Sequence, residues 1–380
     1  MAKKIRVLEM IDDATIGGGQ VHVLMLAKHL DHNTFEVSIA CKEHGFLTDE
    51  ARKHGIEVIP VSMDNHLSLK TFLATTRILR QSNFDILHTH GGTAGFWGRM
   101  CGVFAGRPRI RIHSYHGMHY LSKHNVSSFR LQMTDRFLLC LSDKVVCVCE
   151  SDFKKGLQAG IVTAKKGVII HNGIEAKNFR DFKRRDALRA EFGLKESDIL
   201  FGNVGRLHRQ KGQRYLIDAF QKVKNKNPQA ELWIVGEGEL REELKKGALD
   251  SGVYDSVHFL GARTDIPEIL SAIDIFVLPS LWEGQPITIL EALAAGKAVI
   301  ATNVDGIADI LVNEKNALLV PPKDSHALSV AMNKMIQDRE LRARISSAAI
   351  NTMSEKFTAE RMAGLIGELY QKTYSMRFGK

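Results

Sequence analysis

The sequence has no long apolar run. Its best stretch, Ile273 to Trp282, is too short to span a bilayer and is interrupted by Asp274. We therefore expect no membrane-spanning helix. The first residues lead at once into a strand-like segment, Ile5 to Leu8, instead of the apolar core of a signal peptide. We therefore expect a cytoplasmic protein.

Proline and cysteine are also scarce. With 8 Pro in 380 residues, 44% hydrophobic and 25% charged residues, the composition excludes a disordered or fibrous chain and is typical of a globular protein. The five cysteines form an odd set, and the closest two, Cys147 and Cys149, do not have the usual zinc or redox spacing. We expect buried free thiols.

Acidic residues are too few to balance the basic ones, and the net charge is +9. The excess is concentrated in residues 1–180, which hold 24 of the 52 Lys and Arg but 16 of the 43 Asp and Glu. Thirteen of the 16 His also lie there. This imbalance predicts an anionic partner for the first half of the chain: a phosphorylated acceptor, an acidic membrane surface or nucleic acid.

Strand-like apolar runs alternate with helix-period segments along the chain, which predicts an α/β fold of parallel strands and crossover helices. The length predicts two domains. The first series of strands is expected at Ile5–Met10, Glu36–Cys41, Ile56–Val61, Asp85–His88, Ile110–Ser114, Lys144–Val148 and Gly167–Ile170. The second is expected at Ile199–Val204, Glu231–Val235, Val257–Leu260, Ile275–Leu278, Ala298–Ala301 and Ala317–Val320. We predict doubly wound, Rossmann-like domains at 1–175 and 197–357, a charged linker at 176–196, and a C-terminal helix at 358–380 that crosses back to the N-terminal domain.

The loop after the first strand contains Gly17, Gly18 and Gly19 before a predicted helix. Glycines at this place let backbone amides approach a phosphate, and the helix dipole adds to the attraction. A dinucleotide fingerprint needs a glycine where His22 stands, so the loop does not favour a dehydrogenase. A flexible turn without a ligand remains the alternative.

A second glycine loop follows the first strand of the second series. Between Gly205 and Gly212 it carries three cations, Arg206, Arg209 and Lys211. A guanidinium fork and an ammonium at a strand end suit a diphosphate. A solvated basic turn is the alternative reading.

The densest signal is a strand, loop and helix with two carboxylates, Glu283 in the loop and Glu291 on the helix, which Pro286 opens. Eight helical residues would separate them by about 12 Å, too far for the carboxylate pair of a glycosidase. They therefore have different roles, and binding of a diol such as ribose is one that carboxylates perform. Two ordinary surface glutamates are the alternative.

The pattern Pro-Ser-x-x-Glu-Gly…Leu-Glu-Ala-Leu-Ala-Ala-Gly around Glu283 and Glu291, with Val-Gly-Arg-Leu…Lys-Gly ending after Lys211, resembles the retaining nucleotide-sugar glycosyltransferases of family 4, which have the GT-B fold. The likeness spans nearly the whole chain. It implies that the second domain binds the donor and the first the acceptor. Arg206 and Lys211 would bind the donor diphosphate. Glu291 would bind the nucleotide ribose.

The same resemblance implies roles for the remaining residues. Glu283 would orient the transferred sugar, and the segment that follows it would assist: Gly284, Gln285, Pro286 and Ile287. Gly17 and Gly18 would approach the phosphates from the first domain. His116 would lie beside the reacting centre, so that His116, Glu283, Arg206 and Lys211 are the implied catalytic residues. The family often has Glu where Gln20 stands and different residues at Gln285-Pro286, which leaves the identity of the sugar open.

We predict no metal site and no cofactor other than the donor as co-substrate. His116 stands among other histidines, but no cysteine or carboxylate joins them in the sequence as zinc sites often require. These are His88, His90, His113, His119 and His124, which line an acceptor pocket or are surface residues. No Asp-x-Asp occurs, so arginine, lysine and a helix terminus would neutralise the diphosphate without a divalent ion.

The basic stretch between Arg99 and Arg136 holds seven Lys and Arg, one acid and several interleaved aromatic residues. It predicts peripheral contact with an anionic membrane, unless the aromatic residues fill the core. We favour transfer of a sugar from a UDP-sugar to a glycan or glycolipid of the bacterial surface, such as a polysaccharide or lipopolysaccharide. Two alternatives are a nucleotide-sugar epimerase or hydrolase, and a non-catalytic nucleic-acid-binding protein; the latter lacks a recognition motif, so no nucleic acid is expected.

Overall fold

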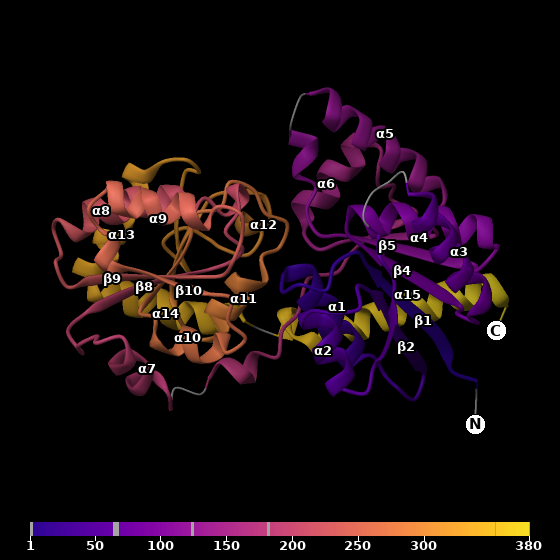
Figure 1. Cartoon of the computed structure of the whole chain (residues 1–380), viewed down its shortest axis with the longest axis horizontal. Helices are drawn as coiled ribbons and strands as arrows, with labels where there is room; N and C mark the ends of the chain where they lie inside the picture. The colour runs from indigo at the N-terminus through magenta and orange to yellow at the C-terminus, as the bar shows by residue number, and fades with distance from the viewer. Residues whose placement is uncertain (1–2, 64–67, 123–124, 181–182, 354, 380) are drawn as a thin grey trace. The chain divides into compact units, whose positions relative to one another are not determined.

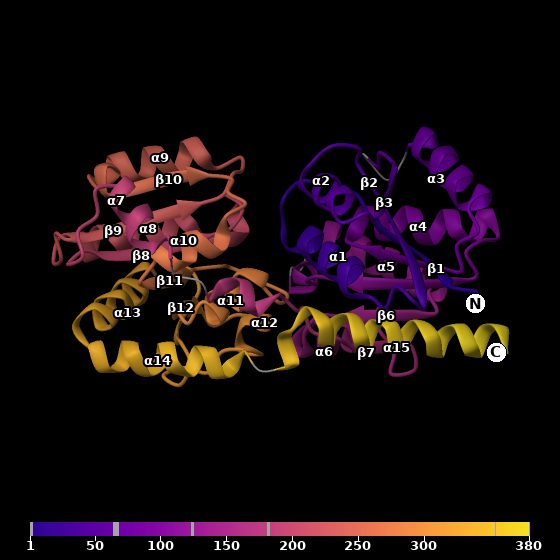
Figure 2. The ribbon, with the colours of Figure 1, turned by 90° about the horizontal axis from the view of Figure 1, so that it is seen from below.

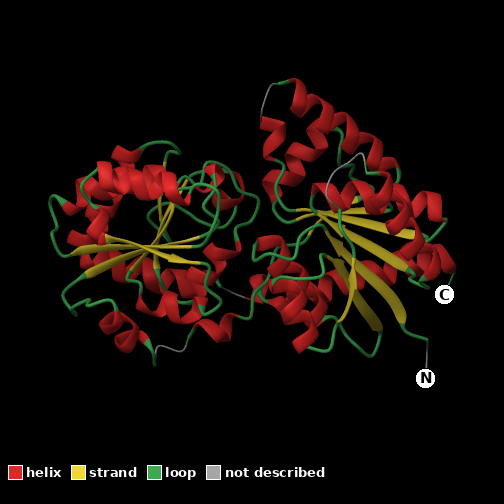
Figure 3. Ribbon diagram, viewed as in Figure 1, coloured by secondary structure: helices red, strands yellow, loops and turns green. Residues whose placement is uncertain are grey.

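The structure is a computed structural model that describes residues 3–63, 68–122, 125–180, 183–353 and 355–379. The chain forms two compact units. Unit 1 comprises Met1–Gly173 and Ala359–Lys380, and unit 2 comprises Ile174–Thr358. In each unit a parallel sheet lies between layers of helices (Figures 1 and 3).

Unit 1 contains a seven-stranded sheet with the order β3-β2-β1-β4-β5-β6-β7. Its apolar strands are buried on both faces, as the continuous apolar runs require. The strands are β1 Ile5–Ile11, β2 Phe35–Cys41, β3 Glu57–Pro60, β4 Ile86–His90, β5 Ile110–Tyr115, β6 Lys144–Cys147 and β7 Gly167–Ile169. The helices are α1 Gly18–His29, α2 Phe46–Lys53, α3 Leu69–Gln81, α4 Gly92–Ala105, α5 Val126–Cys140, α6 Glu150–Ala159 and α15 Ala359–Phe378.

Unit 2 contains a six-stranded sheet with the order β10-β9-β8-β11-β12-β13. The strands are β8 Ile199–Val204, β9 Ala230–Val235, β10 Val257–Gly261, β11 Ile275–Leu278, β12 Ala298–Thr302 and β13 Leu318–Val320. The helices are α7 Arg185–Glu191, α8 Gln213–Lys224, α9 Arg241–Asp250, α10 Ile266–Ala272, α11 Ile287–Ala294, α12 Asp305–Ala308, α13 Ser325–Gln337 and α14 Arg339–Thr352. Every expected strand of both series therefore has a counterpart here, with ends that differ by at most two residues.

The C-terminal helix α15 belongs to unit 1 and packs along α1 (Figure 2). Its buried face includes Met362, Ile366 and Tyr370, which join the same apolar cluster as the inner face of α1. The end of the chain therefore completes the core of the first unit.

The described residues of the segment 176–196, which was expected as a linker, belong to unit 2. The guanidinium of Arg189 is buried and donates to the carbonyl of Ala272 and to the carboxylate of Asp274. Arg185 also pairs with Asp274, at 3.1 Å. The charges that suggested a solvated linker instead fasten α7 to the sheet.

Two further observations concern the cysteines and the search for a membrane-spanning helix. Four of the five free cysteines are buried, but Cys140 is exposed at the end of α5, which corrects the expectation that all would be buried. In the described part of the chain, no helix has both the length and the apolar character that crossing a bilayer requires.

Candidate functional site

The candidate residues of unit 2, apart from Ile287 and Glu291 on α11, lie in two loops at the carboxyl edge of the sheet. One loop, residues 205–212, follows β8, and the other, residues 279–286, follows β11. These strands are neighbours, and their connections diverge because β8 leads to β9 on one side while β11 leads to β12 on the other. Ligands of doubly wound sheets bind at such a switch point.

Close backbone contacts hold these loops together. Gly212 has a φ of +65°, and a Cβ added there would lie 2.2 Å from the carbonyl oxygen of Pro279. The amide of Leu281 donates to the carbonyl of Gln210 at 2.7 Å. Gly236, from the loop after β9, approaches Gly205 equally closely, with 2.1 Å from an added Cβ to the Gly205 oxygen. Only glycine permits these approaches.

Glu283 is the centre of a buried polar group in this site. Its Oε1 accepts from Lys211 Nζ at 2.6 Å and from Ser280 Oγ at 2.7 Å, and its Oε2 accepts from Gln210 Nε2 at 3.1 Å. The two candidates Lys211 and Glu283 are thus brought into direct contact. Ser280 and Gln210 were not singled out in the sequence, although both stand inside the two motifs.

Arg206 lies in the same loop as Lys211 but is arranged differently. Its side chain is exposed, and its guanidinium makes no hydrogen bond or ion pair with any described residue. The aliphatic chain of Lys211 runs over Gly205, 3.5 Å from the position of an added Cβ. Arg206 is therefore available to an anionic ligand, as is Arg209, which is also exposed and has no partner among the described residues.

The second loop ends at the amino terminus of α11. Pro286 is the N-cap, with extended backbone (φ −71°, ψ 119°), and the first helical residue is Ile287. The expectation that Pro286 opens the helix is therefore corrected by one residue, because its fixed φ suits the N-cap as well. The first turn carries no acidic residue, and the dipole of such a helix end favours an anion. The hydroxyl of Thr288 is buried and has no partner among the described residues.

The remaining candidates of this loop and helix are buried to different degrees. Gly284 and Gln285 are buried beside Glu283. Glu291 is half-buried, and no described residue donates to its carboxyl group. Burial raises the pKa of Glu291 to about 7, because desolvation disfavours the charged form. The structure does not place Glu291 among ordinary surface glutamates.

In unit 1 the first glycine loop lies at the other switch point, between β1 and β4. Gly17 is the N-cap of α1, and Gly18 is its first residue. A Cβ at Gly18 would meet nothing within 4 Å, and the first turn of α1 carries no acid. The helix therefore starts earlier than expected, and its amino terminus is open to an anionic group.

His116 follows β5 and joins a buried hydrogen-bonded group. Its Nε2 lies 3.1 Å from Nδ1 of His90, and Nε2 of His90 lies 2.8 Å from Oε2 of Glu9. Burial lowers the pKa of His116 well below its ordinary value, and that of His90 to about 3. Sequence reasoning missed Glu9, although a carboxylate in the middle of an apolar strand was a visible signal.

The other histidines divide between the two faces of the sheet. His88 and His90 are fully buried, and His113 is buried on the opposite face against Thr89. None of these three is a surface residue, which corrects that alternative. His119 is exposed, and His124 lies outside the described residues.

Within the described residues, two groups have ligand atoms close enough for a metal ion: His22, His90 and His116, and Glu9, His88 and His90. Most of these nitrogens and oxygens are hydrogen-bonded to one another or to Tyr370, Ser114 and Asn172. Among the described residues, His116 Nδ1 has no partner, and His22 Nε2 is buried without one. Nδ1 of His22 lies 2.9 Å from Oδ1 of Asn172. Metal independence stays a prediction.

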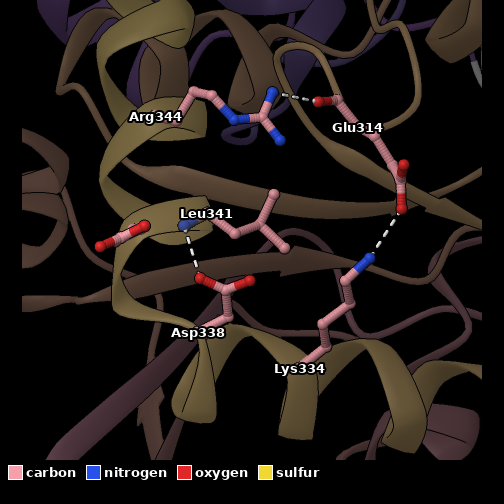
Figure 4. A pocket seen from close by; sticks show the side chains of 6 residues that line it. Glu314, Lys334, Asp338, Leu341 and Arg344 are labelled. Atoms are coloured by element: carbon pink, nitrogen blue, oxygen red, sulfur yellow. Dashed lines mark hydrogen bonds and ion pairs between the residues drawn. The ribbon is translucent and has the colours of Figure 1, made fainter.

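A depression of about 320 Å³ in unit 2 lies elsewhere, near the ends of α13 and α14 (Figure 4). Its polar groups bind one another. Lys334 pairs with Glu314 at 2.6 Å, Arg344 donates to the Glu314 carbonyl, and Asp338 caps α14. These contacts stabilise the helix ends, and we assign the depression no chemistry.

Two family models match the chain. Residues 16–178 match the family described as Glycosyltransferase Family 4, and residues 184–352 match the family described as Glycosyl transferases group 1. The UDP-Gal:alpha-D-GlcNAc-diphosphoundecaprenol alpha-1,3-galactosyltransferase of Escherichia coli is 29% identical over 350 residues, which are 90% of each protein. The N,N'-diacetylbacillosaminyl-diphospho-undecaprenol alpha-1,3-N-acetylgalactosaminyltransferase of Campylobacter jejuni is 26% identical over 80% of this chain and 82% of its own length.

Among solved structures, Alr3699/HepE of Anabaena in complex with UDP and glucose superposes with a TM-score of 0.85. Its sequence is 22% identical, and the match covers 97% of this chain and 99% of that one. At this identity the likeness shows that the two chains share a fold.

Proposed function

Because the chain belongs to glycosyltransferase family 4 and has the GT-B fold, with two Rossmann-like domains, we propose that it is a retaining enzyme that uses UDP-sugars. The group transferred is a hexosyl or N-acetylhexosaminyl residue. The acceptor is a hydroxyl of a glycan or glycolipid. The observation that carries this proposal is the arrangement of Arg206, Lys211 and Glu283 beside the open amino terminus of α11.

In this proposal unit 2 binds the donor. Arg206 binds the diphosphate as a planar fork, and the amides of the first turn of α11 add their dipole. Lys211 neutralises charge while it holds Glu283 in place, because the two form a 2.6 Å ion pair. Glu283 and the loop from Gly284 orient the sugar, and Glu291 accepts from the ribose hydroxyls. No divalent metal takes part.

The reaction breaks the bond between the anomeric carbon of the sugar and the phosphate oxygen. The acceptor oxygen bonds to the same face of that carbon, and its proton passes to the departing phosphate oxygen. Charge on the leaving diphosphate grows in the transition state, where Arg206 and Lys211 stabilise it most. In this proposal His116 is a catalytic residue beside the reacting centre, and the amides at Gly17 and Gly18 help to bind the donor phosphates.

Relatives support the acceptor class. The Escherichia coli and Campylobacter jejuni relatives are named for transfer to sugars on diphospho-undecaprenol, a lipid carrier. Another relative, from Rhizobium meliloti, is named as a lipopolysaccharide core mannosyltransferase. We propose that this chain acts on such a lipid-linked, anionic acceptor in cell-surface polysaccharide or lipopolysaccharide synthesis, at the cytoplasmic face of the membrane.

Helix α5 is the proposed contact with the membrane. Val126, Phe129 and Phe137 are exposed at helical spacing on one side of α5, with Arg130 and Arg136 beside them. Apolar side chains flanked by arginines suit an anionic bilayer. The basic stretch as a whole is not one surface, because Arg99 is buried against Asp135.

Vesicle flotation tests this contact. We expect binding to vesicles with anionic lipid, weakened by salt, and loss of most of it in a Phe129→Ser/Phe137→Ser variant. Ile350→Ser removes an exposed apolar side chain of α14 in unit 2 and is the matched control. Equal binding of all three proteins would reject α5 as the contact.

Calorimetry with UDP, GDP and ADP, with magnesium or a chelator, tests the donor site. We expect selective binding of UDP that survives the chelator. Turnover with the lipid-linked acceptor should fall at least about 100-fold in Glu283→Gln and Lys211→Ala. Turnover within a few-fold of the parent in both variants would reject the proposal.

The same assays separate the two alternatives. Release of free sugar or of an epimer without an acceptor would favour a hydrolase or epimerase. Absence of nucleotide binding, with salt-dependent retention of a nucleic acid, would favour a binding protein.

A further inference from the structure

Six side chains on one face of the unit 1 sheet form a continuous hydrogen-bonded chain, which we call the relay. Strand alternation places its members together: Glu9 on β1 is the register partner of His88 on β4, and His90 is the partner of Ser114 on β5. The relay consists of Ser114, His88, Tyr370, Glu9, His90 and His116. Tyr370 comes from α15, so the relay joins residues from both ends of the polypeptide.

The contacts of the relay run in sequence. Ser114 Oγ lies 2.8 Å from His88 Nε2, and His88 Nδ1 lies 2.5 Å from the Tyr370 hydroxyl. Tyr370 donates to Glu9 Oε1 at 2.6 Å. Glu9 Oε2 lies 2.8 Å from His90 Nε2, and His90 Nδ1 lies 3.1 Å from His116 Nε2.

Burial decides the direction in which the protons point. All members except His116 have an exposed fraction of 0%, so a net charge inside the relay would be costly. With Glu9 protonated every member is neutral, and each donates to the next, from the Ser114 hydroxyl to His90 Nδ1–H. Burial raises the pKa of Glu9 to about 8 and lowers the pKa of His88 well below its ordinary value, which agrees with a neutral relay.

The direction of the relay determines which proton His116 carries. If His90 donates to Nε2 of His116, the proton of the half-buried His116 ring is on Nδ1, and no described residue binds that atom. If Glu9 were ionised, Tyr370 would still donate to it, but His90 Nε2 would also donate to it and His90 Nδ1 would accept from His116 Nε2. His116 would then present a lone pair at Nδ1. The protonation state of Glu9 therefore decides whether Nδ1 of His116 is a hydrogen-bond donor or an acceptor.

We propose that Glu9 and His90 are positioning residues that hold His116 in the Nδ1–H tautomer, so that it donates a hydrogen bond to an anionic oxygen of the substrates. The role toward the substrate rests on the proposed function. The tautomer does not, since it follows from the buried chain alone. The leaving phosphate oxygen is the group that gains most from such a donor.

The surroundings of the relay contain few other titratable groups. His22 from α1 packs edge-on against His116, with ring centroids 4.7 Å apart, and burial lowers the pKa of His22 to about 3. His113 lies on the opposite face of the sheet, bonded to Thr89. These side chains are neutral, so Glu9 is the member whose proton is lost first as the pH rises.

Nitrogen-15 NMR of the imidazole rings tests the tautomer directly in the whole protein, without any substrate. The signals of His116 are identified by their loss in His116→Asn. We expect the proton on Nδ1 at pH 7 and on Nε2 at pH 9 or above. A proton on Nε2 at both pH values would overturn the proposal.

Two substitutions of Glu9 distinguish its role as a hydrogen-bond donor to His90 from its role in filling space. Leucine fills similar space but donates nothing, so Glu9→Leu should mix the tautomers of His116 and lower turnover about 10-fold or more. In the parent protein, turnover should fall above pH 8 as Glu9 loses its proton. Glutamine keeps a donor toward His90 and an acceptor toward Tyr370 and does not ionise, so Glu9→Gln should restore the tautomer and the turnover and remove this alkaline loss. Glu57→Gln, which alters a carboxylate on β3 bonded to Ser38, is the matched control.

A third variant tests the contribution of α15. The hydrogen bond from Tyr370 lowers the pKa of Glu9, so Tyr370→Phe should move the alkaline loss of turnover to higher pH. Tyr374→Phe, one turn along the helix, should leave it in place. Unchanged pH profiles in Glu9→Gln and Tyr370→Phe would overturn the relay.

The outcomes distinguish this inference from the proposed function. If nucleotide binding and transfer are absent but His116 carries its proton on Nδ1 at pH 7, the proposed function fails and the relay stands. If transfer is present with the other tautomer, the relay fails alone. Stoichiometric zinc that is retained by the parent and lost in His22→Asn would also overturn it, because nitrogens bound to a metal cannot be bonded to each other.

Discussion

Arg206 and Lys211 show how two cations in one loop come to have different roles. Lys211 is largely buried and committed to Glu283, whereas Arg206 is exposed and has no partner among the described residues. A cation without a protein partner contributes little to stability. Its substitution should therefore separate binding from folding.

We expect Arg206→Ala to weaken UDP binding at least about 10-fold, since a hydrogen bond to a charged group is lost. The Tm should stay within about 2 °C of the parent, because no protein contact is removed. Calorimetry and thermal unfolding measure the two effects. Arg339→Ala, an exposed arginine at the start of α14, controls for the change in net charge. Equal UDP affinity in both variants would contradict the role of Arg206.

The raised pKa of Glu291 predicts that stability and UDP affinity depend on pH. Its pKa of about 7 lies above the ordinary value of 4.5, so its contribution to stability is fully present below pH 4.5 and is lost as the pH rises through about 7. UDP affinity should change in the opposite direction, increasing through pH 7, because the ionised carboxylate is the better acceptor for ribose hydroxyls.

Glu291→Gln should remove both effects, and Glu242→Gln, on the exposed face of α9, should remove neither. Calorimetry and chemical denaturation between pH 5 and pH 8 measure them. A parent protein whose affinity and stability are flat over this range would show that Glu291 does not titrate there.

At the scale of elements, the site of unit 2 depends on how closely the loops after β8, β9 and β11 approach one another. The approach of Gly212 to Pro279 and of Gly236 to Gly205 leaves no room for a Cβ. The loops, rather than the helices they precede, bring Lys211 to Glu283.

Gly212→Ala should destabilise unit 2 and abolish UDP binding, since it adds both an unfavourable φ and a clash with the Pro279 oxygen. Gly252 has a similar φ of +68° but open space around it. Gly252→Ala should therefore cost only the strain of about 1–2 kcal/mol and retain binding. Thermal unfolding and calorimetry distinguish the two. Similar losses in both variants would show that φ, not the close approach, is the constraint.

At the scale of the whole molecule, the chain leaves unit 1 at Gly173 and returns to it with α15. The returning helix buries Ile366 and Tyr370 in the core of unit 1. The stability of unit 1 therefore depends on residues at the far end of the chain.

Ile366→Asp should destabilise unit 1 by about 3 kcal/mol or more, because it buries a charge in an apolar cluster. Hydrogen exchange should increase throughout residues 3–173 and stay unchanged in residues 183–353. Lys372→Asp, on the exposed face of α15, should change neither. Exchange that increases equally in both units would contradict the division of the chain.

The sequence by itself determined the strands, the two sheets and the loops that carry Arg206, Lys211 and Glu283, because buried parallel strands are continuous apolar runs and glycines follow them at the strand ends. It also identified the family, through motifs confined to short local spacings. The sequence did not predict the contacts that tertiary packing creates. Whether the charged residues near Arg189 form a linker or an anchor depends on the half-buried Asp274 that they meet.

Only the tertiary structure showed that Lys211 pairs with Glu283 and that Glu9, His90 and Tyr370 stand in line with His116. The members of these groups are separated by tens to hundreds of residues, and no local pattern relates them. Strand order and register decide which of them are neighbours. Burial then decides which carry charge, because desolvation acts on a side chain through its surroundings in space and not through its place in the sequence.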